Sequence, residues 1–288
     1  MNVAILVVLY DKLLEDSNSL KSLLAICPDN VSLTVINNGP EKIINITSFH
    51  TNLVSKFKCF KLIEYVNNKP LSILYNDFIN SMPDVDYYIL FDDDSIISSD
   101  FISVINNLGD EEFDILVPKI KSIRDDRIYY PVEEGVVVEQ ERALDPKKTF
   151  SIGSGMIISN SCVNKILVHY PTIFDERYAF YGVDMSIFRR IRLIIKKSKK
   201  PCFTLITRGM VLHSLSRIDS KLTIFRASER LIDATLTFRN YFGFMNAIDL
   251  VRIFARGFSV LGWHKSLSII LTYVFSGCHH RSKKWNSN

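Results

Sequence analysis

The sequence predicts an α/β fold with a doubly wound, mostly parallel sheet, and three observations lead to this prediction. Continuous apolar, β-branched runs recur through the first third of the chain, as expected of strands buried on both faces of a sheet. Segments with helical spacing separate these runs, an alternation typical of parallel sheets covered by helices. Clusters of Asn or Asp follow the runs, at the strand ends where such sheets bind ligands.

The first strand is expected at residues 3–10, and three more follow at 31–39, 58–66 and 86–91. Ser17 can cap a helix after the first strand, because its hydroxyl can accept a hydrogen bond from a first-turn backbone N–H. Residues 71–81 have the apolar spacing of another helix. In the second half we expect strands at 115–120, 132–140 and 203–214 and helices at 162–169, 183–195 and 225–245.

The composition excludes several classes of protein. With 47% hydrophobic and 23% charged residues among 288, the chain is not intrinsically disordered. Its 35 basic and 31 acidic residues give a net charge of +4, too small to indicate a nucleic-acid partner. Five cysteines are scattered without a CxxC pair, which favours a reduced compartment over a disulfide framework.

No targeting or membrane-spanning segment is expected. The apolar run at residues 3–9 has no basic residue before it and no small-residue cleavage site after it, so we interpret it as a strand and not as a signal peptide. No uninterrupted apolar run approaches the length of about 18 residues that a spanning helix requires.

Three aspartates follow the strand expected at 86–91. Side chains alternate along a strand, so Asp92 and Asp94 should point to one side and Asp93 to the other. Paired carboxylates repel each other unless a cation lies between them, and Mg²⁺ and Mn²⁺ prefer oxygen ligands. The alternative is a solvated Asp-rich turn, but the position at the end of a buried strand favours a metal site.

Two further residues have both a structural and a functional interpretation. Asp184 opens the helix expected at 183–195, where the macrodipole keeps a carboxylate ionised, as a general base must be. Considered on its own, a carboxylate in this position is more often a plain helix cap than a base. His213 ends the strand expected at 203–214, and a single His in that position is more often structural than a ligand.

The order and spacing of several segments resemble family 2 glycosyltransferases, especially their rhamnosyltransferase-like bacterial branch. YILFDDDS resembles the Asp-x-Asp segment of that family, VVLYD its first strand and VINNG its second. NNKPLSILYNDFI resembles a further family segment, with Lys69 where Gly is more usual. FDERYAFYGVDMSIFRR resembles the segment that carries the catalytic carboxylate. The similarity runs from residue 3 to about 241.

The resemblance implies an A-type glycosyltransferase (nucleotide-diphosphosugar transferase) fold and a role for each matching residue. Asp184 matches the catalytic base, and Asp92, Asp94 and His213 match metal ligands. The nucleotide-binding residues implied are Leu9, Tyr10, Asn38, Asn68, Asn76 and Asp93. The residues implied for the acceptor or the diphosphate are Gly155, Asp175, Glu176, Tyr181, Arg217 and Arg239.

The implied activity is that of an inverting, metal-dependent hexosyltransferase with Mn²⁺ or Mg²⁺ as cofactor. Its donor would be a UDP- or dTDP-linked sugar, and its acceptor a lipid-linked saccharide in bacterial surface polysaccharide biosynthesis (O-antigen or capsule). Such an enzyme would be cytoplasmic and peripheral on the inner face of the cell membrane. No nucleic-acid partner is implied.

We expect a catalytic domain at residues 1–246 and an amphipathic basic tail at 247–288. The apolar residues of the tail recur at helical spacing, and Lys and Arg residues flank them. Such a helix can lie in the interface of an anionic membrane. The alternatives are that it packs on the catalytic domain or forms a homodimer contact. The apolar residues are Val251, Phe254, Phe258, Leu261, Ile269, Ile270, Tyr273 and Val274.

Two other classes of function stay open at this point. A metal-dependent nucleotidyltransferase or phosphohydrolase would also use Asp92 and Asp94, but it would release pyrophosphate or phosphate instead of a nucleoside diphosphate. A polyanion-binding module would use the basic tail together with Lys196, Lys197, Lys199 and Lys200, and its binding would depend steeply on salt.

Overall fold

The computed structural model describes residues 1–26, 30–198, 202–215 and 222–287. Within these residues the strands are β1 (Val3–Leu9), β2 (Ser32–Asn37), β3 (Cys59–Glu64), β4 (Tyr87–Asp92), β5 (Ile96–Ile97), β6 (Ile115–Ser122), β7 (Ile128–Tyr130), β8 (Val132–Glu133), β9 (Val136–Val137), β10 (Arg142–Leu144), β11 (Thr149–Phe150), β12 (Met156–Ser159) and β13 (Leu205–His213). The helices are η1 (Leu14–Asp16), α1 (Asn18–Ile26), α2 (Ser48–Lys56), α3 (Leu71–Asn80), α4 (Ser99–Asn106), α5 (Asn160–Leu167), α6 (Val183–Ser198), α8 (Ile224–Asn240), α9 (Phe244–Ser276) and α10 (His280–Trp285).

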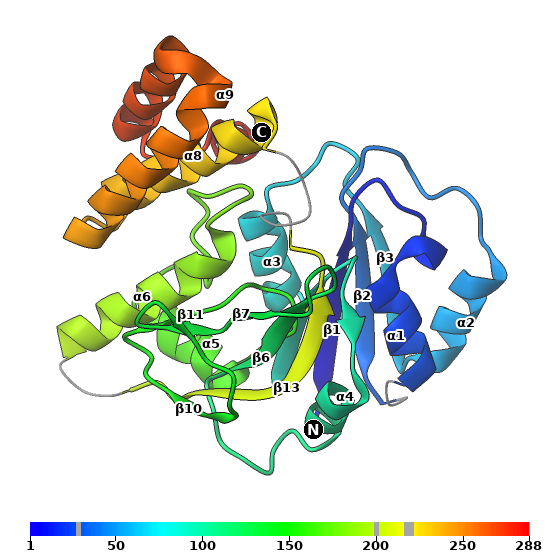
Figure 1. Cartoon of the computed structure of the whole chain (residues 1–288). Helices are drawn as coiled ribbons and strands as arrows, with labels where there is room; N and C mark the ends of the chain where they lie inside the picture. The colour runs from blue at the N-terminus through cyan, green and yellow to red at the C-terminus, as the bar shows by residue number, and fades with distance from the viewer. Residues whose placement is uncertain (27–29, 199–201, 216–221, 288) are drawn as a thin grey trace. The chain divides into compact units, whose positions relative to one another are not determined.

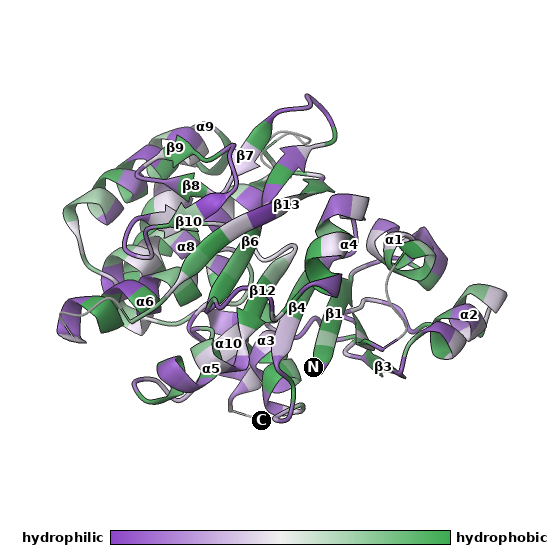
Figure 2. Ribbon diagram, turned by 90° about the horizontal axis from the view of Figure 1, so that it is seen from below, coloured by the Kyte–Doolittle hydropathy of each residue, from purple (hydrophilic) through white to green (hydrophobic). Residues whose placement is uncertain are grey.

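The main sheet has the order β10-β13-β6-β12-β4-β1-β2-β3 (Figure 1). Strands β1 to β4 are mutually parallel, whereas β12 lies antiparallel between β4 and β6. Every residue of β1 is buried, as the run without polar positions predicts. The central strands β1, β6 and β12 are correspondingly coloured mostly as hydrophobic (Figure 2). The doubly wound, mostly parallel α/β fold is therefore confirmed.

The expected elements of the first half are confirmed to within a few residues. Ser17 precedes α1, and its hydroxyl accepts a hydrogen bond from the Leu20 N–H at 3.2 Å. Two expectations in the second half are wrong. Residues 132–140 form a hairpin of β8 and β9, because the backbone turns back at Glu134 and Gly135, both with positive φ. The helix expected at 225–245 ends at Asn240, and α9 begins at Phe244.

The chain forms two compact units. The first contains Met1–Asn68, Phe78–Ile173 and Arg190–Leu215, and so holds the sheet. The second is assembled from Lys69–Asp77, Phe174–Arg189 and the residues from Ser216 to the C-terminal end. The second unit is thus built from three stretches that are far apart in sequence. The expected division between residues 1–246 and 247–288 stays a prediction.

In the second unit, α9 folds back along α8. The Gly262 backbone interrupts the helix with φ 72°. The half before it packs near the start of α8, where Leu261 lies against Ala227 and Leu231. The half after it returns to the end of α8, where the Arg239 Nε donates to the Val274 carbonyl at 3.1 Å. The two helices lie against each other in Figure 1.

This packing uses much of the apolar face expected in the tail. Phe254, Ile269 and Ile270 pack with Leu261 against α8, so the alternative in which the tail packs on the rest of the chain holds for these side chains. A different set of apolar residues on α9 is exposed. No helix in the described part of the chain is long and apolar enough to cross a bilayer.

Candidate metal and nucleotide site

Two carboxylates and an imidazole meet at the carboxyl end of the sheet in the first unit. Asp92 ends β4, Asp94 follows two residues later, and His213 ends β13. One ligand atom from each of the three lies within 4.8 Å of the other two. The prediction that Asp92 and Asp94 point to one side is confirmed. His213 joins them because β13 runs parallel to β6 in the same sheet.

His213 is nearly buried between the two carboxylates. Its Nδ1 lies 3.1 Å from the Asp94 Oδ1 and its Nε2 lies 3.8 Å from the Asp92 Oδ2. The Nδ1 is also 3.0 Å from the Ser95 hydroxyl, which in turn contacts the hydroxyl of Ser154. This chain of buried hydroxyls fixes the orientation of the imidazole ring, as the outer-shell partners of metal-binding histidines do.

The three side chains fit a divalent cation. The Asp94 Oδ1 is buried and has no hydrogen-bond partner among the described residues, since its approach to His213 lacks hydrogen-bond geometry. A buried carboxylate oxygen without a donor is costly unless a cation compensates it. Two carboxylates with one imidazole form a donor set suited to Mn²⁺ or Mg²⁺, and the imidazole favours Mn²⁺.

Asp93 points away from this group, as the alternation predicts. Its carboxylate pairs with the Lys12 ammonium at 2.6 Å and accepts a hydrogen bond from the Tyr10 N–H at 3.2 Å. Burial raises the pKa of Asp93, and the hydrogen bond and charge of Lys12 oppose that rise. Asp93 therefore fixes the loop after β1, which leaves the Tyr10 side chain half exposed at the strand end.

The Asn clusters that follow β2 and β3 also meet at this edge. The Asn38 Nδ2 donates to the Asn68 Oδ1 at 3.3 Å, and the Asn38 N–H donates to the Leu9 carbonyl at 2.8 Å. The Asp11 N–H donates to the Gly39 carbonyl at 2.7 Å, so the loops after β1 and β2 are tied together. Leu9 itself is fully buried. Polar groups of three neighbouring strand ends thus surround one position, as expected of a nucleotide site.

Asp184 lies in the second unit, in the first turn of α6. Since the helix begins at Val183, Asp184 is inside the helix and is not its capping residue. The Ser186 hydroxyl donates to the Val183 carbonyl at 2.6 Å and accepts from the Asp175 N–H at 3.0 Å. The backbone around Asp184 is therefore fixed by a buried serine.

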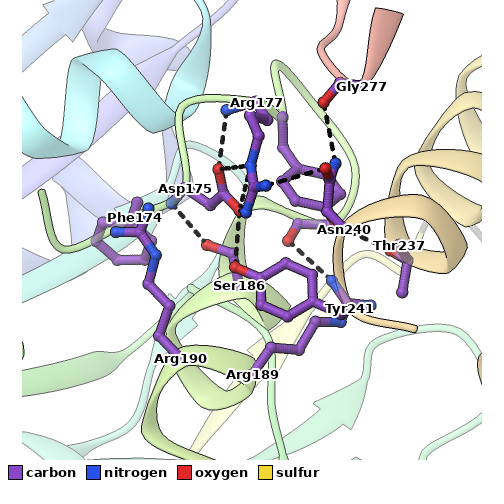
Figure 3. Close-up of polar contacts among 12 residues, drawn as sticks. Phe174, Asp175, Arg177, Ser186, Arg189, Arg190, Thr237, Asn240, Tyr241 and Gly277 are labelled. Atoms are coloured by element: carbon purple, nitrogen blue, oxygen red, sulfur yellow. Dashed lines mark hydrogen bonds and ion pairs between the residues drawn. The ribbon is translucent and has the colours of Figure 1, made fainter. Parts of the chain in front are cut away.

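Three other predicted residues of the second unit, Asn76, Asp175 and Glu176, are held by internal contacts. The Asn76 amide bonds both backbone groups of Phe174 and the carboxylate of Glu176. The Asp175 carboxylate is 2% exposed and is bound by Arg177 and Tyr241 (Figure 3). The predicted contact of Asn76 with the nucleotide, and those of Asp175 and Glu176 with the acceptor or diphosphate, stay predictions.

Tyr181 and Arg239 are more accessible. The Tyr181 ring lies against Phe180, with 4.5 Å between ring centroids, and the Arg230 guanidinium lies over it at 5.5 Å. Arg239 is exposed, although its Nε is bonded to the Val274 carbonyl. The roles of these residues also stay predictions.

The remaining predicted residues are Gly155 and Arg217. Gly155 is buried in the first unit, where its N–H donates to the Leu90 carbonyl at 2.7 Å. Arg217 lies outside the described residues, as do Lys199 and Lys200 of the polyanion alternative.

Sequence reasoning missed Lys12, Arg177 and Tyr241, which hold predicted site residues in place. A partial signal exists for Arg177, because it follows Asp175 by two residues in the segment FDER. Lys12 and Tyr241 reach Asp93 and Asp175 across 81 and 66 residues of sequence, so no local pattern identifies them.

No protein-family model matches the sequence, and the search of curated proteins found no match. Solved structures do match. A structure of S. aureus TarS 1-349 in complex with UDP-GlcNAc has a TM-score of 0.56 at 10% identity and covers 98% of this chain and 83% of that chain. A structure of GalNAc-T7 with UDP, GalNAc and Mn²⁺ has a TM-score of 0.54 at 10% identity, with coverage of 96% and 57%.

A longer S. aureus TarS structure has a TM-score of 0.52 at 10% identity, and the chain spans about half of it, with coverage of 96% of this chain and 53% of that one. Similarity at this level of identity establishes the fold. The chain has the A-type glycosyltransferase fold, as the resemblance implied.

Proposed function

We propose that the chain is a metal-dependent, inverting glycosyltransferase that uses a nucleotide-diphosphate sugar as donor. The observation that carries the proposal is the grouping of Asp92, Asp94 and His213 beside the strand ends that gather Asn38 and Asn68. A cation site next to a nucleotide site is the arrangement that a leaving diphosphate requires. The fold shared with structures that contain UDP or UDP-GlcNAc supports the same assignment.

In the proposed reaction, the acceptor hydroxyl attacks the anomeric carbon of the donor sugar. A new bond forms between the acceptor oxygen and that carbon, while the bond from the carbon to the nucleoside diphosphate breaks. Asp184 accepts the proton of the hydroxyl. Asp92, Asp94 and His213 would hold a divalent cation, whose chemistry is neutralisation of the charge on the leaving diphosphate.

The nucleotide would lie at the ends of β1 and β2. Tyr10 offers a half-exposed ring, and Asn38 offers an amide for recognition of base or ribose. Asp93 and Lys12 would act by holding the loop that carries Tyr10. A UDP- or dTDP-linked donor and the rhamnosyltransferase-like branch stay part of the proposal.

The proposed acceptor is a lipid-linked saccharide, as used for O-antigen or capsule, reached from the cytoplasmic surface of the membrane. Exposed apolar and basic side chains on α9 support such a peripheral location, because apolar groups enter the interface while Lys and Arg bind anionic lipid. The exposed residues are Val251, Arg252, Arg256, Phe258, Trp263, Lys265, Leu267, Leu271 and Phe275.

The proposal is tested by incubating the protein with a panel of UDP- and dTDP-sugars and Mn²⁺, and by measuring the nucleoside diphosphate released. We expect release from one donor class, its loss in EDTA and its recovery with added Mn²⁺. Asp94→Ala should abolish turnover and weaken Mn²⁺ binding measured by calorimetry without donor. Asp110→Ala, at an exposed carboxylate in a turn, is the matched control and should keep both properties.

Two results would contradict the proposal. Release of pyrophosphate instead of nucleoside diphosphate would identify a nucleotidyltransferase. Full turnover by Asp94→Ala in excess EDTA would remove the metal from the reaction.

A further inference from the structure

The segment between Phe174 and Gly182 leads directly into the turn that carries Asp184. Within the second unit, its contacts come from residues that are distant in sequence, many of them at the C-terminal end. The centre of these contacts is the buried carboxylate of Asp175 (Figure 3).

Asp175 is bound by charged and polar donors on both of its oxygens. The Arg177 Nε donates to the Oδ1 at 2.8 Å, and the Arg177 Nη2 donates to the Oδ2 at 2.5 Å. The Tyr241 hydroxyl also donates to the Oδ2, at 2.7 Å. Such a fork-to-carboxylate pair fixes both groups in one plane. We call Asp175, Arg177 and Tyr241 the Asp175 hub.

The hub is connected to the base on one side. The Asp175 N–H donates to the Ser186 hydroxyl at 3.0 Å, and this hydroxyl donates to the Val183 carbonyl at 2.6 Å. Val183 and Ser186 flank Asp184 in the first turn of α6. A displacement of Asp175 therefore displaces the turn that orients the base.

The hub is connected to the C-terminal helices on the other side. The Arg177 Nη1 donates to the Asn240 Oδ1 at 2.9 Å, and the Asn240 Nδ2 donates to the Gly277 carbonyl at 3.0 Å. The His279 N–H donates to the Arg177 carbonyl at 2.9 Å. Arg177 is thus held by Asn240 at the end of α8, which the residue after α9 also binds, and by His279, the residue before α10.

A second contact set holds the same segment. The Tyr178 hydroxyl lies 3.1 Å from the Thr237 hydroxyl of α8. The Tyr178 carbonyl accepts from the hydroxyls of Ser282, in α10, and Ser72, in α3. Helices α8 and α10 therefore contact the segment that precedes the base, and the end of α9 is linked to it through Asn240.

We propose that Asp175, Arg177 and Tyr241 are positioning residues, through which α8, α9 and α10 hold the Asp184 carboxylate in its reactive orientation. This inference rests on the proposed function of Asp184 as the base. It replaces the direct acceptor contact expected for Asp175, because the carboxylate is enclosed and its oxygens are bound. It also makes the C-terminal helices part of the catalytic apparatus in addition to any role at a membrane.

The test compares Tyr241→Phe and Arg177→Lys with the wild-type full chain. Tyr241→Phe removes only a hydroxyl, and Arg177→Lys keeps the charge but loses the fork. A misplacement of about 1 Å at a catalytic group costs about 100-fold in rate. We expect kcat to fall about tenfold to 100-fold in each variant. The affinity for the nucleotide-sugar donor that the wild type turns over, measured by calorimetry, should stay within about twofold, because no hub residue is among the metal or nucleotide ligands proposed above.

Tyr129→Phe is the matched control. The Tyr129 hydroxyl donates to the Asp125 carboxylate at 2.6 Å at the surface of the first unit. The Tyr129→Phe substitution therefore removes the same kind of hydrogen bond, but away from the hub. Its kcat should equal that of the wild type. A role limited to folding would lower the stability of the hub variants and leave kcat unchanged at a temperature where they are folded.

Amide hydrogen exchange of residues 174–189 provides a readout that does not depend on turnover. We expect faster exchange there in Tyr241→Phe and Arg177→Lys and no change in Tyr129→Phe. Unchanged exchange together with unchanged kcat would overturn the inference. If the wild type turned over no donor, the proposed function would fail. Amide exchange of residues 174–189 in the hub variants would still show whether the hub fixes this segment: faster exchange would support the hub, and unchanged exchange would not.

Discussion

The turn before Asp184 allows a prediction whose magnitude follows from the structure. Gly182 has φ +78°, a conformation that costs a residue with a side chain about 1–2 kcal/mol. A Cβ at this position would overlap the Asp233 Oδ1 and lie 2.8 Å from both the Asp233 Cγ and the Tyr178 Cδ1. Neither neighbour moves easily, because both side chains are hydrogen-bonded to Thr237.

Gly182→Ala should therefore lose stability through two separate effects. The backbone conformation contributes about 1–2 kcal/mol, and the forced displacement of packed neighbours adds about 1–3 kcal/mol. The chain offers a control for the first effect alone. Gly135 has φ +85° and nothing within 4 Å of its virtual Cβ, so Gly135→Ala should lose only the backbone contribution.

The measurement is urea unfolding followed by far-ultraviolet circular dichroism, together with kcat for each variant. We expect Gly182→Ala to be the less stable variant by about 1–3 kcal/mol and to lose turnover, since the turn that carries Asp184 must shift. Gly135→Ala should keep its kcat. Equal losses of stability in the two variants would refute the packing around Gly182 described above.

Three further predictions concern Asp184, a buried thiol and α9. Asp184→Asn keeps the shape of the side chain but cannot take a proton, so kcat should fall about 10²–10⁴-fold with unchanged donor affinity; a kcat within a few-fold of wild type would leave Asp184 a structural role only. Cys162 is fully buried, and burial, followed by the charge of Asp114, raises its pKa well above 9.0. Because the Cys162 thiol has a higher pKa in the folded than in the unfolded state, its contribution to stability is complete below pH 9.0 and is lost as the pH rises towards the folded pKa. Above pH 9.0, the unfolding free energy of the wild type should therefore fall more steeply than that of Cys162→Ala. Parallel pH curves for the two proteins would contradict this. Replacing Trp263 and Phe275 by Ser should reduce sedimentation with anionic vesicles while turnover of a water-soluble acceptor persists, whereas undiminished sedimentation would show that this face of α9 is not the anchor.

The sequence predicts β1 and the centre of β4 well because burial on both faces removes polar positions from them. It does not predict where β12 lies, since an antiparallel strand between β4 and β6 depends on pairing between distant segments. The hairpin of β8 and β9 was missed because Glu134 adopts a positive φ that is uncommon for this residue type. The break between α8 and α9 lies in an apolar stretch, Tyr241 to Met245, where periodicity alone gives no boundary.

The candidate site was predictable to the extent that its residues end strands. Asp92 and Asp94 follow from the alternation along β4, but the position of His213 beside them depends on the placement of β13, which only the family resemblance indicated. The buried support of these residues was not predictable. Ser95 and Ser154 are small polar residues in unremarkable positions, and their contact with each other spans 59 residues.

The discontinuity of the second unit has a consequence for the order in which the protein is made. The segment around Arg177 leaves the ribosome about a hundred residues before Gly277, which binds the Asn240 partner of Arg177, and His279, which binds the Arg177 carbonyl. At about 5–20 residues per second, this interval lasts about 5–20 s. During that time the strands of the first unit can pair, whereas residues 174–189 lack the hydrogen bonds of Gly277 and His279. We expect ribosome-stalled chains that end before residue 277 to be cleaved by protease within residues 174–189, and chains that expose the whole sequence to resist. The segment that precedes Asp184 would then become ordered only after residues 277–279 have left the ribosome.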